Sequence, residues 1–174
     1  TYTYDEVHNL TSVTDPMGFV TRYDYDANDN VTAVTFPDGT QTTYTYDKVN
    51  QVSSMTDALG AVTKYSYDGN GNLTQVVDAE GYVWGYTYDA ANRLTAINDG
   101  RGNDWTFAYD NEGNLTVATD PLEHSASKSY DAMGQLVSET DRNGNIWTYT
   151  YDKDGRKTSA TDPLGNVTSY TYDE

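Results

Sequence analysis

The chain has 174 residues, a length that suits one ordinary domain, and the absence of Cys excludes disulfides and thiolate chemistry. With 27 acidic against 10 basic residues the net charge is −17, the wrong sign for binding phosphate backbones or anionic membranes. Only two His are present, which argues against a multi-histidine metal centre, and no apolar run approaches the 18 or so residues of a membrane-spanning helix.

A Tyr-Asp dipeptide recurs every 21 residues, from Tyr4-Asp5 to Tyr172-Asp173, with no insertion or deletion. The copies between these two are Tyr25-Asp26, Tyr46-Asp47, Tyr67-Asp68, Tyr88-Asp89, Tyr109-Asp110, Tyr130-Asp131 and Tyr151-Asp152. A period this strict indicates one structural unit, repeated. We therefore interpret residues 1–174 as a single array of eight tandem repeats. This array is expected to be a window on a longer one, or else its exposed ends pair with neighbouring copies.

The first predicted element of each repeat is a turn that follows the Tyr-Asp pair, as in Asp110-Asn111-Glu112-Gly113. Its fourth position holds only residue types that tolerate a positive φ. These residues are His8, Asp29, Asn50, Gly71, Asn92, Gly113, Gly134 and Gly155. The pattern is typical of a type I turn closed by a left-handed residue and a G1 bulge.

The recurring Asp is best explained as the acceptor of an Asx turn, in which its carboxylate binds backbone N–H groups. A structural Ca²⁺ ion at Asp152-Lys153-Asp154-Gly155 stays open as an alternative, but an EF-hand loop needs Gly at position 6 and Glu at 12, and here Gly falls at position 4. We expect no other cofactor. Both His8 and His124 are expected to be solvated.

A short segment rich in β-branched residues follows, such as Leu73–Val77. It is predicted to form a strand, because it is too short for a stable helix. Its apolar positions, such as Leu94 and Ile97, are three apart rather than two. This breaks simple alternation and predicts a bulge or a strong twist.

The second turn is Asp15-Pro16-Met17-Gly18 in the first repeat, and all four Pro of the chain occupy its second position. Proline there suits a type I or type II turn. The fourth position is Gly in seven of eight copies, and Glu123 is the exception. The glycines are Gly18, Gly39, Gly60, Gly81, Gly102, Gly144 and Gly165.

The last element is a strand whose alternation places Trp84, Tyr86 and Tyr88 on one face. Two strands a repeat predict an all-β fold: a continuous antiparallel meander of about 16 strands built from 21-residue β-hairpin repeats. The apolar content is too low for a two-layer core, so the options are a curled strip, a hollow shell or a tube. Tyrosines of successive repeats lie two strands apart, and a Tyr–Leu–Tyr ladder is the expected packing seam. The leucines of this ladder are Leu73, Leu94, Leu115 and Leu136.

The motif Gly-x4-Tyr-x-Tyr-Asp-x2-Gly, as in Gly144, Tyr149, Tyr151, Asp152 and Gly155, closely resembles the YD repeat. Such repeats build the shells of bacterial Rhs proteins, the C-component cocoon of Tc toxins and the teneurin ectodomain. The resemblance covers the whole chain. It implies a β-sheet strip that spirals into a hollow shell, which in the bacterial toxins encloses a C-terminal cargo, and it implies an extracellular or cell-surface location.

The sequence departs from that family in its very regular period. Identical units repeat one rotation and rise, which predicts an extended, self-continuing fibre or tube, and a shell segment stays open beside it. Asp162-Pro163-Leu164-Gly165 matches half of the DPxGL-type motif near which related shells cleave themselves, but Asn166 follows. No protease assignment therefore carries over.

The function hypothesis is a structural segment without enzyme activity, because no unlike catalytic groups converge outside the repeat. Its expected partners are further repeats and an enclosed cargo polypeptide, and nucleic acid is excluded. A second hypothesis is an adhesive surface on which Trp84, Trp105 and Trp147 bind glycans, although a buried seam is the preferred interpretation of this row. Five N-x-[ST] sequons permit glycosylation in a host that performs it. They begin at Asn9, Asn30, Asn72, Asn114 and Asn166.

Overall fold

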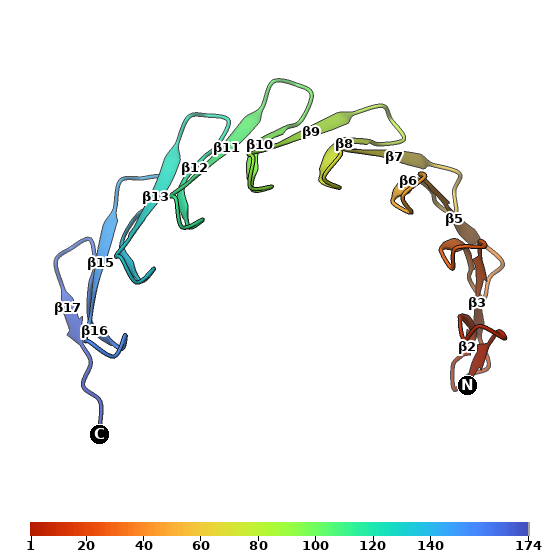
Figure 1. Ribbon diagram of the computed structural model, residues 1–174, viewed down its shortest axis with the longest axis horizontal. Helices are drawn as coiled ribbons and strands as arrows, with labels where there is room; N and C mark the ends of the chain where they lie inside the picture. Colours follow the sequence, from red (N-terminus) through yellow and green to blue (C-terminus); the bar gives the residue numbers. More distant parts are fainter. Residues whose placement is uncertain (174) are drawn as a thin grey trace. The chain divides into compact units, whose positions relative to one another are not determined.

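The computed structural model describes residues 1–173, whose regular structure consists entirely of 17 β-strands (Figure 1). Consecutive strands pair antiparallel, which confirms the predicted all-β meander. The strands are β1 (Tyr2–Tyr4), β2 (Leu10–Thr14), β3 (Val20–Tyr25), β4 (Val31–Thr35), β5 (Gln41–Tyr46), β6 (Val52–Thr56), β7 (Val62–Tyr67), β8 (Leu73–Val77), β9 (Val83–Tyr88), β10 (Leu94–Asn98), β11 (Asp104–Tyr109), β12 (Leu115–Thr119), β13 (Ser125–Tyr130), β14 (Leu136–Thr140), β15 (Ile146–Tyr151), β16 (Lys157–Thr161) and β17 (Val167–Ser169).

The chain forms two compact units, Thr1–Gly85 and a second that begins at Tyr86, so their boundary falls within β9. Each unit is by itself a run of hairpins that repeat the same local structure. Within residues 1–173 no helix has the length and apolar character to cross a lipid bilayer.

Strand pairs across the first turn contain the bulge that the sequence predicts. In β7–β8, Ser66 pairs with Gln75 while Tyr67 pairs with Leu73, so Thr74 is the extra residue. The extra residue returns Leu73 and Val76 to the same face as the tyrosines, which explains an apolar spacing of three. The same shift recurs in β3–β4, β5–β6, β11–β12, β13–β14 and β15–β16.

The fourth residue of every first turn has a positive φ, between 60° at Asn92 and 93° at Gly113, as predicted. The turn is closed by two backbone bonds: Gly113 N–H donates to the Asp110 carbonyl (3.2 Å) and Asp110 N–H to the Asn114 carbonyl (3.0 Å). The second turn has the same pair of bonds in seven of its eight copies, as at Asp15, and its fourth residue also has a positive φ, including 65° at Glu123. Both turns are therefore type I turns with a left-handed closing residue, and the type II alternative for the second turn is wrong. The turn from Asp99 to Gly102 is an exception, because the φ of its second residue, Gly100, is also positive (71°).

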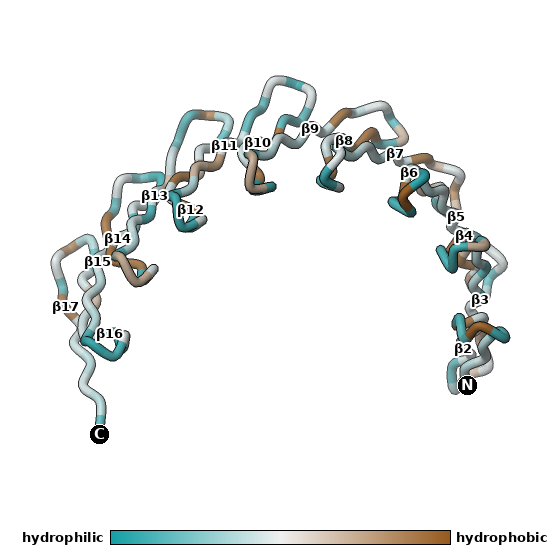
Figure 2. Tube along the Cα trace, in the orientation of Figure 1, coloured by the Kyte–Doolittle hydropathy of each residue, from teal (hydrophilic) through white to brown (hydrophobic). Residues whose placement is uncertain are grey.

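One sheet layer leaves little room for a core. Among the described residues, Ala33 is the one buried hydrophobic side chain, at 7% exposure. Apolar residues are spread along the chain in short stretches, and no segment gathers them (Figure 2). The hairpins are consequently held together by hydrogen bonds and by half-buried side chains on one sheet face.

Replacing Gly113 by Val is expected to destabilise the chain by about 1–2 kcal/mol, because a β-branched residue is strained in the left-handed region. A Cβ at Gly113 would approach nothing closer than 3.7 Å, so the cost comes from backbone strain and not from a clash. Gly69→Val is the matched control, since Gly69 lies in a first turn with an ordinary φ and open space around it. Equal urea midpoints for the two variants would show that the left-handed assignment is irrelevant to stability.

Candidate functional site

Each first turn is clamped by the carboxylate of its recurring aspartate. Asp68 Oδ1 accepts the N–H groups of Asn70 and Asn72, both at 2.9 Å. The same oxygen accepts the equivalent bonds at Asp5, Asp26, Asp47, Asp89, Asp131 and Asp152, and at Asp110 it accepts the bond from Asn114. The structure thus contains the Asx turns that the sequence predicts.

A second row of aspartates clamps the second turns in the same way, a role that the sequence pattern did not reveal. Asp15 Oδ1 accepts Met17 N–H at 2.8 Å and Phe19 N–H at 2.9 Å. Matching bonds occur at Asp57, Asp78, Asp99, Asp120, Asp141 and Asp162. Phe36 breaks the row, and there Asp38 accepts both Thr40 N–H (3.0 Å) and its hydroxyl (2.7 Å). The recurrence of Asp at the first position of the second turn, in seven of eight copies, was the available signal.

Hydrogen bonds to these carboxylates favour their charged form. The pKa values of Asp26, Asp68 and Asp110 lie below the ordinary value, first because an Asn side chain four residues later donates to Oδ2 and then because backbone N–H groups donate to Oδ1. The pKa of Asp152 is lowered first by the Arg156 backbone N–H and then by its guanidinium. Turn carboxylates therefore couple folding to protonation.

The same hydrogen bonds and ion pairs occupy the carboxylate oxygens of the turns. Asp152 Oδ1 is used by two N–H groups, and its Oδ2 lies 2.8 Å from Arg156 Nε. Across residues 1–173 no three His, Asp or Glu side chains are grouped as metal ligands would be. Both carboxylate oxygens of Asp152 therefore already have protein partners, and a structural Ca²⁺ ion at this turn stays a prediction.

The second tyrosine of the repeat links neighbouring hairpins. Tyr67 Oη donates to the Val52 carbonyl at 3.0 Å, from β7 to the start of β6. β6 and β7 pair over only three residues next to the second turn, so this carbonyl lies beyond the ladder, and the tyrosine ring spans the gap. Equivalent bonds run from Tyr25, Tyr46, Tyr109, Tyr130, Tyr151 and Tyr172. The predicted Tyr–Leu–Tyr ladder is thus also a ladder of hydroxyl-to-carbonyl bonds.

Replacing Tyr67 by Phe is expected to lower the free energy of unfolding by about 1 kcal/mol, because a half-buried carbonyl loses its donor. Tyr65→Phe is the matched control: it lies on the same strand and face, and its hydroxyl makes no hydrogen bond among residues 1–173. Chemical denaturation of both variants measures the difference. If Tyr65→Phe cost as much as Tyr67→Phe, the carbonyl bond would not be the stabilising element.

Alkaline pH is expected to weaken the fold through three of these tyrosines and through Tyr149. Burial raises the pKa of Tyr25, Tyr46 and Tyr67, and the hydrogen bond to Glu139 together with burial raises that of Tyr149 to about 12. A raised folded-state pKa contributes stability that is complete below the unfolded value near 10 and is lost as pH rises through the folded value. Circular dichroism and phenolate absorbance, followed together, should change in one transition. Phenolate formation well before loss of strand signal would contradict the coupling.

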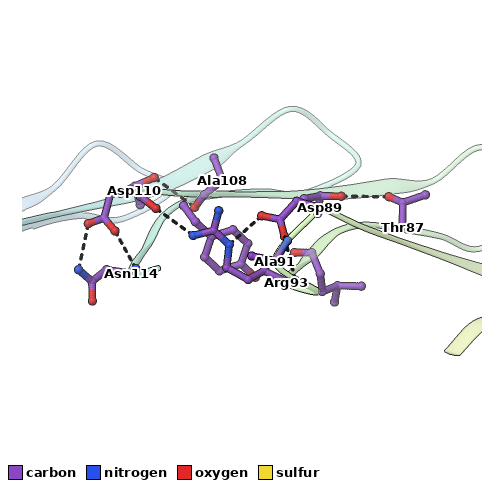
Figure 3. Close-up of polar contacts among 11 residues, drawn as sticks. Thr87, Asp89, Ala91, Arg93, Ala108, Asp110 and Asn114 are labelled. Carbon is purple, nitrogen blue, oxygen red and sulfur yellow. Dashed lines mark hydrogen bonds and ion pairs between the residues drawn. The ribbon is translucent and has the colours of Figure 1, made fainter. Parts of the chain in front are cut away.

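A third ladder runs along the first-turn edge. Side chains of the residue after the left-handed position reach the next repeat, as Asn30 Nδ2 does to Asn50 Oδ1 (2.9 Å) and Gln51 Nε2 to the Gly71 carbonyl (3.2 Å). In Figure 3, Arg93 extends from Asp89 toward Asp110: its Nε lies 2.7 Å from Asp89 Oδ2, and its Nη1 donates to the Asp110 carbonyl at 2.9 Å. The side chains of sequon residues such as Asn30 and Asn114 take part in these turn-edge contacts.

The tryptophan row is not buried, and the expectation of a sealed seam is wrong. Trp84 is 37% exposed, and Trp105 and Trp147 are half-buried. The reason is that the sheet is a single layer, so no second layer covers the aromatic face. Both His8 and His124 are exposed, as expected.

The family model of the RHS Repeat matches residues 4–41, 25–62, 46–82, 67–104, 88–123 and 130–167. The chain belongs to the RHS-repeat family. These matches reproduce the 21-residue period and cover most of the array, so the resemblance stated from the Tyr-Asp motif is confirmed. No curated protein matches the chain.

Solved structures of Tc toxin proteins share the fold. A crystal structure of TcdB2-TccC3 superposes with a TM-score of 0.73 at 15% identity over 96% of this chain. The complex TcdB2-TccC3-Cdc42 gives 0.71 at 15% over 96%, and TcdB2-TccC3 without the hypervariable C-terminal region gives 0.67 at 15% over 97%. The RHS-repeat chain spans only 11–12% of the length of these proteins.

Proposed function

We propose that this RHS-repeat chain is a structural segment of a larger shell-like or filamentous assembly and has no enzyme activity of its own. One observation carries the proposal: the polar groups that recur in every repeat are used inside the array. Turn carboxylates bind backbone N–H groups, and tyrosine hydroxyls bind carbonyls of the preceding hairpin. An active site needs unlike groups converging around a free reacting centre, and these groups are already engaged.

The larger assembly is proposed from the fold relatives. Proteins of the TcdB2-TccC3 type are many times longer than this chain, and one of them is described with and without a hypervariable C-terminal region. We place this segment in the wall of such an assembly, extracellular or at the cell surface, with further repeats as neighbours and a polypeptide cargo as the enclosed partner.

Electron microscopy of the native full-length protein tests the proposal. Discrete hollow particles of fixed size support a shell wall, and uniform tubes or fibres support the self-continuing assembly that the regular period predicts. A compact enzyme-like particle with turnover that is lost when one side chain of residues 1–174 is replaced would overturn the structural role.

A glycan-binding surface is the second candidate, and the open tryptophan row is the observation that favours it. Trp84 is 37% exposed on a face without a covering layer. Acrylamide quenching of tryptophan fluorescence in the native protein decides whether the row stays accessible. Quenching near the free-indole rate, combined with saturable glycan binding, supports adhesion, whereas strong protection removes it.

A further inference from the structure

The aromatic face of the second unit contains a hollow of about 200 Å³. Its floor and walls include Leu115 and Ala118 on β12, Ala126 and Lys128 on β13, Glu139 on β14 and Trp147 on β15. All six occupy positions that point to the same face as the repeat tyrosines, because the strand registers align them across four consecutive strands.

The hollow arises where the repeat changes its residues. Ala118 pairs with Ala126, whereas the equivalent pairs elsewhere are larger, such as Val76 with Trp84. Two methyl groups thus stand where four other repeats place Val or Ile beside an indole or a threonine. The missing volume is not refilled, because no second layer lies over this face. Trp147, half-buried, then forms a wall of the space.

The charges at the hollow are also exceptions to the repeat. Lys128 replaces the first tyrosine of its copy, and Glu139, its cross-strand partner, replaces an apolar residue. Glu139 accepts a hydrogen bond from the hydroxyl of Tyr149. A third charged residue of the lining, Asp141, accepts hydrogen bonds from Asn143 and Asn145. Lys128 is exposed and makes no ion pair within residues 1–173, so it is the one charged group of this lining without a hydrogen-bond or ion-pair partner in that part of the chain.

We propose that this hollow binds one aromatic side chain of an extended polypeptide, with a neighbouring carboxylate of that polypeptide paired to Lys128. A cavity of about 150 Å³ lined by apolar side chains accommodates one benzene ring, so the volume here suits a single ring. Trp147 offers an aromatic partner to that ring. The site goes beyond the structural role, since it depends on Ala126, Lys128 and Glu139, which depart from the repeat, and not on the repeat itself.

The openness of the face selects a polypeptide over a free small molecule. Small-ligand sites bury most of the ligand surface in a cleft, and a hollow on a single sheet layer covers only one side of a ring. A chain that crosses the face gains further contacts on both sides of the hollow, with Phe107 next to Ala118 and with Tyr149 beside Glu139. Binding is therefore expected to require the flanking peptide as well as the ring.

The test uses the 174-residue chain and the peptide acetyl-Gly-Phe-Asp-Gly-amide, followed by the indole N–H resonance of Trp147 in ¹⁵N-correlated spectra. A Trp147→Phe variant assigns the resonance. We expect a saturable shift of Trp147, with binding at least about fivefold weaker for the Asn-containing peptide, because the carboxylate no longer pairs with Lys128. Trp84 should not respond.

Two variants that restore residues of other repeats serve as controls, since both residue types already fold at their positions in the array. Ala126→Trp fills the hollow, as Trp84 does in its own repeat, and should abolish the Trp147 shift. Lys128→Tyr restores the tyrosine and should remove the preference for the Asp-containing peptide while the ring still binds. Amide dispersion equal to that of the native chain verifies that both variants are folded.

Several outcomes overturn the proposal: no saturable shift in the native chain, an undiminished shift in Ala126→Trp, or an Asp preference that survives Lys128→Tyr. Phenylacetate provides the small-molecule arm. Equal affinity for phenylacetate and the peptide would show that the flanking chain contributes nothing, and the polypeptide assignment would then be wrong.

Discussion

Acidification is expected to unfold this chain, with the steepest loss of stability below about pH 4, where unfolded aspartates begin to bind protons. The pKa values of four turn aspartates, drawn from both rows, are lowered in the folded state, first by side-chain hydrogen bonds: Asp26, Asp68, Asp141 and Asp162. The unfolded chain therefore takes up protons at a higher pH than the folded chain. Each of these four clamps contributes stability that is complete above the unfolded pKa and is lost as pH falls through the folded pKa.

The effect is large because the clamps repeat. Protonating the carboxylate of Asp68 or Asp141 weakens its bonds to two backbone N–H groups, and the pKa is lowered in the same way at aspartates of both turns in several repeats. In a quasi-one-dimensional array the intrinsic stabilities of repeats add, so small losses accumulate along the chain. We expect the acid transition to be steeper than for a domain of this size with scattered carboxylates.

Urea denaturation at a series of pH values between 7 and 2 measures the transition. Asp68→Asn keeps an oxygen acceptor and removes one titrating group, so its acid limb should be shallower than that of the native chain. Asp24→Asn is the control, because Asp24 is exposed on β3 and lies outside both turns. A free energy of unfolding that is constant from neutral pH down to about pH 3 would contradict the clamp mechanism.

The parts of the fold that could be predicted depend on residues close together in sequence. A left-handed turn residue such as Gly113, and the carboxylate of Asp110 three positions before it, are determined by local backbone geometry, so the residue types alone indicate them. The bulge was equally visible, because two apolar residues three apart on a strand reach the same face only if the strand contains one extra residue between them.

What could not be predicted depends on the register between neighbouring hairpins. The hydroxyl of Tyr67 donates to the Val52 carbonyl because β6 and β7 pair over only three residues. The sequence of a single repeat does not specify the length of this pairing. The exposure of Trp84 was missed for a different reason: burial of an apolar face requires a second layer, and sequence periodicity does not say whether one exists. The hollow beside Trp147 likewise appears only when Ala118 and Ala126 are paired.

Removing one whole repeat is expected to preserve the fold, whereas removing one residue fewer should disrupt it. Deleting residues 47–67 joins Tyr46 to Asp68, so the Tyr-Asp pair, the first turn and every downstream strand keep their phase. The shortened chain loses one repeat with its interface and should otherwise unfold cooperatively like the native chain. Its tyrosine hydroxyls keep equivalent carbonyl acceptors, because each bond spans the same 15 residues.

Deleting residues 47–66 instead joins Tyr46 to Tyr67 and leaves one extra residue before the turn. Side chains alternate between faces along a strand, so Tyr44 and Tyr46 on β5 must move to the opposite face, or the strand must form a second bulge next to the existing one. Either result exposes half-buried rings, and we expect a loss at least about 2 kcal/mol larger than for the whole-repeat deletion, from apolar burial alone. Thermal and urea unfolding of the two deletions, which differ in length by one residue, make the comparison direct. Equal stabilities would mean that the two faces of the sheet are energetically equivalent, and the tyrosine ladder would then not determine the register of the array.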